Sequence, residues 1–91
     1  MTVKVQASSF APNDARVTVG GTVTWEWESS GHTVTSVFEP SFQSAPLSNA
    51  NHVHGPLTFN TAGTYKYYCT VHGSASNGNV SGMSGQVVVG N

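Results

Sequence analysis

The chain has 91 residues, a mass of 9.5 kDa and a formal net charge of −1, and its length suits one domain, residues 1–91. Three cationic side chains are too few for the basic stripe of a nucleic-acid binder, and no apolar stretch approaches the roughly 20 residues of a membrane span. Thirteen valines, ten threonines and nine aromatic residues favour strands joined by turns over helices.

Alternating apolar and polar residues predict three strands in the first third of the chain. They cover residues 2–7, 17–19 and 22–28, and a turn at residues 11–14 separates the first two. In the third strand both tryptophans share an apolar face with Val23. We interpret this face as part of a core.

The middle of the chain is less regular. An extended segment is predicted at residues 32–37, after a Ser-Ser-Gly turn. Residues 38–54 are rich in Ser, Asn and Pro and have no period, so we expect a long loop with a short helix or an edge strand inside it. His52 and His54 in this loop are either a secondary metal site or two ordinary exposed imidazoles.

In the last third of the chain, apolar and polar residues alternate again. This pattern predicts strands at residues 56–60, 65–70 and 87–89, separated by turns. Residues 73–82 are rich in Gly, Ser and Asn, and we expect a loop there. About seven to eight short strands without a helix predict an all-β fold, a two-sheet Greek-key β-sandwich.

The single cysteine, Cys69, excludes an intramolecular disulfide. Such a cysteine is an inert core residue, a nucleophile or a metal ligand. His72 follows three residues later, where the chain leaves the predicted strand, and Met83 lies at the far end of the same loop. A Cys–His nucleophile would need an orienting third group and an oxyanion hole, for which the sequence offers no obvious candidate.

A metal site accounts for this spacing better. The thiolate of Cys69 and the imidazole of His72 can converge on one point, and the Met83 thioether can approach from a third side. His32 is the natural second imidazole, because it follows a turn and opens a strand. A His₂Cys site with a weak axial methionine is diagnostic of blue-copper electron transfer, so the sequence predicts one copper ion per chain.

Supporting hydrogen bonds are expected around these ligands. They should reach the Cys69 sulfur and the ring nitrogens that do not bind the metal. A backbone N–H near Thr33 is the candidate donor to the sulfur, and Thr70 is a further candidate for support.

Three segments of the chain resemble the cupredoxins, in their plastocyanin-like and halocyanin-like branch. Residues 10–36 are similar to the opening half of that family, with its first copper histidine in the HTVTS segment. Residues 59–73 contain the signature GTYxYYCxxH, and residues 82–89, GMSGQVVV, are similar to its closing GMxGxVxV. The resemblance extends over nearly the whole chain, from residue 10 to residue 89.

The resemblance implies that His32, Cys69 and His72 are equatorial copper ligands and that Met83 is the axial one. One feature departs from the family, in which the second histidine and the methionine are only a few residues apart. Here ten residues, 73–82, separate them. We expect this longer loop to be more flexible and to affect the axial contact.

The resemblance also implies a function. A cupredoxin of this kind is a one-electron carrier and not an enzyme, cycles between Cu(II) and Cu(I), and meets redox partner proteins transiently as a monomer. Family habit places it in the periplasm or on the outer face of a membrane, although the sequence shows no secretion signal. An alternative is a copper-binding accessory protein, such as a chaperone, store or sensor, on the same fold. If the protein were a structural module that binds no metal, the presence of Cys, His and Met at these positions would be a coincidence.

Overall fold

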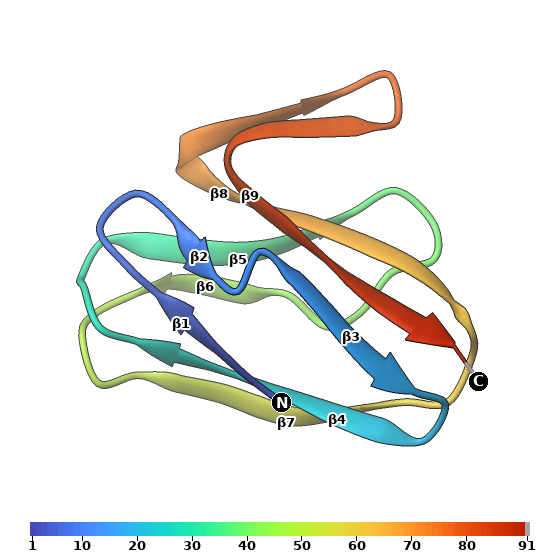
Figure 1. The fold of residues 1–91 in the computed structure, drawn as a ribbon. Coiled ribbons are helices and arrows are strands. Elements are labelled where there is room, and N and C mark those ends of the chain that lie inside the picture. Colours follow the sequence, from blue (N-terminus) through green and yellow to red (C-terminus); the bar gives the residue numbers. More distant parts are fainter. Residues whose placement is uncertain (91) are drawn as a thin grey trace.

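The computed structural model describes residues 1–90, which form two β-sheets and no helix (Figure 1). The predicted all-β, two-sheet sandwich is confirmed. In this part of the chain no helix could span a membrane. Nine strands occur within residues 1–90: β1 (Thr2–Val5), β2 (Phe10–Ala11), β3 (Asp14–Thr18), β4 (Gly21–Trp27), β5 (His32–Val37), β6 (Ala45–Ser48), β7 (Val53–Phe59), β8 (Gly63–Ser76) and β9 (Asn79–Gly90).

The strand order brings the chemically informative strands together. One sheet has the order β2-β1-β4-β7, and the other has the order β3-β9-β8-β5-β6. The pairs β1–β4 and β3–β9 are parallel, and the other pairs are antiparallel. Strand β8, which contains Cys69, therefore lies between β5, which begins with His32, and β9, which contains Met83.

Alternation along the strands explains the core. The inward residues of the two sheets are apolar and buried, while their neighbours point outward. Tyr67 is at the centre, with ring centroids 4.8 Å from Phe10, 5.5 Å from Trp25 and 5.9 Å from Phe42. Burial raises the pKa of its phenol, so Tyr67 stays neutral and acts as an apolar side chain.

Two segments before residue 60 differ from the sequence prediction. Residues 11–14, predicted as a turn, include the end of β2 and the start of β3. Within residues 38–54, the structure has the edge strand β6, which was one of the two alternatives, and β7 already begins at Val53. The alternation of apolar and polar residues does not reveal β2 and β6, because β2 has only two residues and β6 contains a proline.

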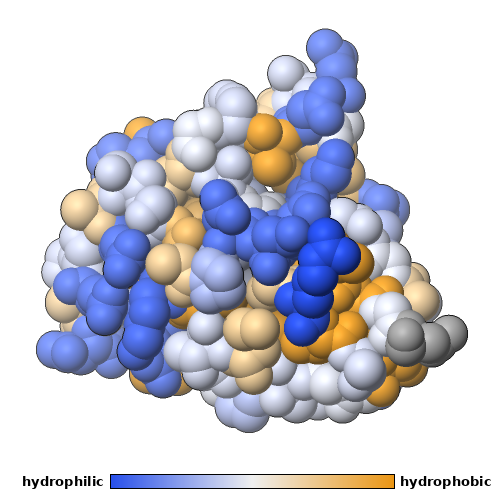
Figure 2. All heavy atoms as spheres, in the orientation of Figure 1, coloured by the Kyte–Doolittle hydropathy of each residue, from blue (hydrophilic) through white to orange (hydrophobic). Residues whose placement is uncertain are grey.

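The prediction of a loop at residues 73–82 is wrong. The ends of β8 and β9 pair there as a regular hairpin, with Ser76 opposite Asn79. Asn77 and Gly78 form the two-residue turn, and both have positive φ angles, 51° and 80°, as a type I′ turn requires. The hairpin stands out from the body of the sandwich and is mostly hydrophilic (Figures 1 and 2).

Gly85 is a position where packing between β8 and β9 tolerates no side chain. A Cβ there would lie 2.6 Å from the Tyr67 hydroxyl oxygen, 2.8 Å from its Cζ and 3.1 Å from the Asn13 carbonyl oxygen. We expect Gly85→Ala to lower the free energy of unfolding by about 2 kcal/mol, because overpacking must displace a buried ring. Gly90→Ala, where a Cβ meets nothing within 4 Å, is the matched control. Equal thermal midpoints for the two variants would contradict this account.

Candidate metal centre

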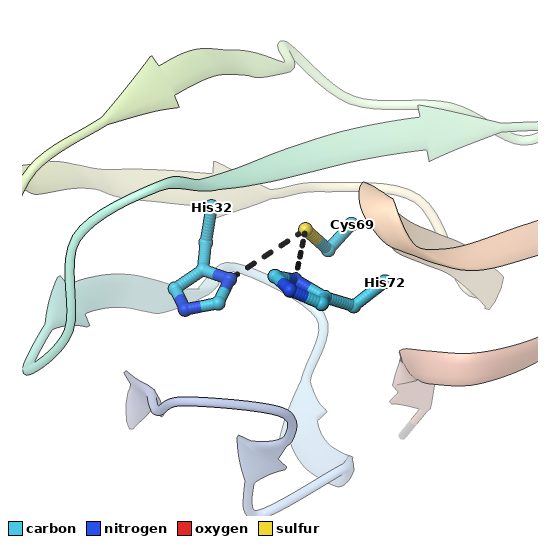
Figure 3. A group of neighbouring side chains, drawn as sticks. All are labelled: His32, Cys69 and His72. Carbon is cyan, nitrogen blue, oxygen red and sulfur yellow. Dashed lines mark hydrogen bonds between the residues drawn. The ribbon is translucent and has the colours of Figure 1, made fainter.

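Three predicted side chains meet at one end of the second sheet. His32 is the first residue of β5, and Cys69 and His72 belong to β8 (Figure 3). The pairing of β8 with β9 is interrupted between Tyr68 and Gly73. This irregularity lets a thiol and an imidazole from the same strand converge, which a regular strand would not do at a spacing of three.

The donor atoms lie at separations that suit a metal ion. The Cys69 sulfur is 3.7 Å from His32 Nδ1 and 3.9 Å from His72 Nδ1, and the three donors lie within 4.8 Å of one another. Metal bonds of about 2.3 Å to sulfur and about 2.0 Å to nitrogen, at angles of about 110–120°, put each nitrogen roughly 3.5–3.7 Å from the sulfur and the two nitrogens about 3.3–3.5 Å apart. The two sulfur–nitrogen distances therefore fit a small three-coordinate ion closely, and the imidazoles, whose donor atoms lie within 4.8 Å, would approach each other when the ion binds.

Burial and chemistry narrow the choice of ion. Cys69 and His32 are buried, whereas His72 is exposed. Burial, and secondarily the neighbouring His72, lowers the pKa of the His32 imidazole, so this side chain is held neutral with a free lone pair. One thiolate with two imidazoles, and no carboxylate in the group, favours copper or zinc over magnesium or calcium.

Hydrogen bonds hold His32 from two sides. Its Nε2 lies 3.3 Å from Ser29 Oγ, which is the support expected for a ring nitrogen that does not bind metal. Trp27 Nε1 donates to the His32 carbonyl at 3.0 Å. The sequence analysis missed Trp27, because alternation identifies a buried tryptophan but not the partner of its N–H.

The hydrogen bond predicted from a backbone N–H near Thr33 to the sulfur is not found. Within residues 1–90, the hydrogen-bond contacts of the Cys69 sulfur are with the two imidazole nitrogens. Instead the Thr70 N–H donates to Thr33 Oγ1 at 3.0 Å. This bond ties β5 to β8 beside His32 and Cys69, so both threonines stabilise the strands and not the sulfur.

Met83, the fourth predicted residue, is buried at the start of the core part of β9. It directly follows Gly82, which pairs with Gly73, the residue after His72. A Cβ on Gly73 would lie 2.5 Å from the Met83 carbonyl oxygen, so the two backbones are in close contact. The two ends of the hairpin therefore bring Met83 beside His72.

His52 and His54 make contacts outside the metal centre. The His52 ring packs against Trp27 with centroids 4.9 Å apart, and His54 Nε2 lies 2.7 Å from the Gln43 carbonyl oxygen. In residues 1–90, neither histidine belongs to a group of three metal-binding side chains. The structure thus favours two ordinary histidines, His52 exposed and His54 half-buried, over a secondary metal site.

Comparisons with known proteins agree with this geometry. The family model described as copper binding proteins, plastocyanin/azurin family, matches residues 1–90. A plastocyanin from Scenedesmus fuscus is 34% identical and covers 98% of both chains. A solved amicyanin structure is 30% identical, with a TM-score of 0.74, over 98% of this chain and 80% of the other. A purple cupredoxin from Nitrosopumilus maritimus has the same fold, with a TM-score of 0.73 at 23% identity over 97% of both chains.

Proposed function

Because the chain belongs to the plastocyanin/azurin family of copper-binding proteins, we propose that it carries single electrons between redox partners through one type 1 copper site. It is a cupredoxin that binds copper. The observation that supports electron transfer most directly is the position of the Cys69 sulfur, which is buried between two imidazoles. A thiolate with two imidazoles is the donor set of electron-transfer copper sites.

In this proposal His32, Cys69 and His72 would hold the copper, and Met83 would contribute a weaker sulfur donor. The converging nitrogen and sulfur atoms support the first three assignments. Burial of Met83 beside the end of the hairpin supports the fourth. The sequence resemblance, which extends to the closing GMSGQVVV segment, supports the complete set.

Each protein group has a task in the proposed mechanism. Copper, when bound, supplies a one-electron Cu(II)/Cu(I) couple. The buried strands hold His32 and Cys69 in place, so little has to rearrange when an electron arrives. Apolar packing excludes water from the sulfur, whereas the exposed His72 offers a partner protein the shortest approach.

The remaining aspects of the proposal follow from the family. The chain acts as a single domain of residues 1–91, catalyses no reaction of its own, and meets its partners transiently as a monomer. Plastocyanin-like cupredoxins work outside the cytoplasm, so we place this protein in the periplasm or on the outer face of a membrane. A net charge of −1 on 91 residues offers little electrostatic steering toward any partner.

A copper titration tests the proposal. Apo-protein titrated with Cu(II) should develop an intense thiolate-to-copper absorption band that saturates at one equivalent, and voltammetry should give a reversible wave. Absence of the band at any ratio would overturn the copper–thiolate site. A band with an irreversible wave and ready release of copper to a partner would favour the accessory-protein alternative.

Replacing Met83 tests the axial assignment. We expect Met83→Leu to bind copper at one equivalent with a higher reduction potential, because the weak sulfur donor favours Cu(II). Leucine has a similar volume, so the free energy of unfolding of the apo-protein should change by less than about 1.5 kcal/mol. Voltammetry and thermal unfolding measure the two effects. An unchanged potential would assign the axial position to another group.

A further inference from the structure

The hairpin that separates His72 from Met83 is held at its tip by a side chain from the sheet. Beyond its base the hairpin turns back in the direction from which β8 came (Figure 1). There Lys66 Nζ donates a hydrogen bond of 2.7 Å to the Gly78 carbonyl oxygen in the turn. Lys66 is twelve residues before Gly78 in the chain, and only the folded-back hairpin brings the turn within its reach.

The ammonium group of Lys66 is free for this contact. The other two cationic side chains within residues 1–90, Lys4 and Arg16, pair with carboxylates. The ammonium group of Lys66 instead donates to a backbone carbonyl, and a hydrogen bond from a charged donor is stronger than one from a neutral donor. Among residues 1–90, it is the one hydrogen bond between the turn of this hairpin and the body of the protein.

The backbone at the base of the hairpin also suits this folded-back direction. Gly73 and Gly82 pair there, and a Cβ on Gly82 would lie 2.7 Å from the His72 carbonyl oxygen. Gly82 also has a φ angle of +69°, which glycine adopts at little cost. Ala75 and Val80, which are opposite each other, are half-buried, while most other hairpin residues are exposed serines and asparagines. The hairpin thus has an apolar pair on one face and a fixed base and tip.

We propose that Lys66 is a positioning residue for the copper site: its bond to Gly78 clamps the hairpin 73–82 and so fixes the orientation of the hairpin relative to His72 and Met83. The proposal rests on the copper function proposed above. Pairing of Gly73 with Gly82 holds the two ends of this ten-residue connection together, but without the clamp the paired hairpin would pivot about that base, next to both ligands. The clamp therefore explains how this chain accommodates the unusual separation of its ligands.

Variants of the two lysines test the clamp. Lys66→Met removes the ammonium group but keeps much of the apolar stem, Lys66→Arg keeps a charged donor, and Lys4→Met is the matched loss of a lysine from the other sheet. In the apo-protein, we expect the amides of residues 74–81 to exchange with solvent about five- to tenfold faster in Lys66→Met. Lys66→Arg should restore most of the protection, and Lys4→Met should leave it unchanged.

The copper-loaded protein provides the second measurement. A Cu(I) chelator such as bicinchoninate should remove copper about fivefold faster from Lys66→Met than from the wild type, because outer contacts tune metal affinity. The visible band should still saturate at one equivalent. Wild-type kinetics in Lys66→Met for both exchange and release would overturn the clamp, and faster exchange with unchanged release would overturn its positioning role.

Two other outcomes separate this proposal from its premises. Faster exchange throughout β8 and β9, not only in the hairpin, would show that Lys66 supports the whole sheet, and it would overturn a specific clamp. A wild-type protein that develops no copper–thiolate band would overturn the proposed function, whereas the exchange experiment on the apo-protein would still decide whether Lys66 holds the hairpin.

Discussion

Cys69→Ser should abolish the intense visible band of the copper-loaded protein. The Cys69 sulfur is the only thiol in the chain and lies between His32 Nδ1 and His72 Nδ1. A serine hydroxyl is a harder and far less acidic donor than a thiol, so the variant offers copper two imidazoles and no thiolate. We expect copper affinity to fall by at least about a hundredfold. Absorption spectroscopy and a competitive chelator measure the two effects.

The fold must survive for this result to be informative. Serine has nearly the volume of cysteine, and its hydroxyl would face the same imidazoles, so the apo-protein should unfold within about 2 kcal/mol of the wild type. Circular dichroism checks this. His52→Gln is the control, because His52 packs against Trp27 and lies outside the donor group. An intense band that persists in Cys69→Ser would exclude the thiolate as a copper ligand.

The strands of this protein were predictable because their side chains alternate. Residues 22–28 place Trp25 and Trp27 on one face, and both are buried in β4. The same pattern places Tyr67 and Cys69 inward on β8. Alternation reports which side of a strand meets the core, and a core between two sheets is sufficient to determine the fold class.

The three converging side chains were predictable for a different reason. Cys69 and His72 are close in sequence, so their meeting needs only a local irregularity in β8. His32 is far from them in sequence, and its position depends on the pairing of β5 with β8. Composition and periodicity do not give that pairing. The family resemblance supplied it, and the distances between donor atoms agree with it.

The hairpin at residues 73–82 was not predicted, although the sequence contains a signal for it. Few apolar residues occur there, which suggests a loop, yet Asn77-Gly78 is the dipeptide that type I′ turns prefer. Periodicity was the wrong criterion, because a hairpin outside the core needs no buried face. The contact between Lys66 and Gly78 is beyond any local signal, since it depends on the direction in which the hairpin folds.

Trp27→Phe should destabilise the protein much more than Trp25→Phe. Both tryptophans are buried in β4, and both replacements remove a similar volume, at a cost of about 1–2 kcal/mol for the space left. Trp27 Nε1 donates to the His32 carbonyl, so its loss costs about 1–2 kcal/mol more. Trp25 Nε1 is buried and makes no hydrogen bond of normal geometry within residues 1–90, although the Tyr67 hydroxyl lies near it, so phenylalanine removes a poorly satisfied group there.

The two variants therefore serve as controls for each other. We expect a thermal midpoint roughly 10 °C lower for Trp27→Phe than for Trp25→Phe, since about 1 kcal/mol shifts a domain of this size by about 4–8 °C. Trp27→Phe should also weaken copper binding about tenfold, because the lost bond holds the backbone of His32. Equal midpoints would mean that the Trp27 hydrogen bond contributes little. If the two variants bound copper equally well but had different thermal midpoints, Trp27 would stabilise the core without affecting the copper site. His32 would then be held in place by Ser29 and by the strand pairing alone.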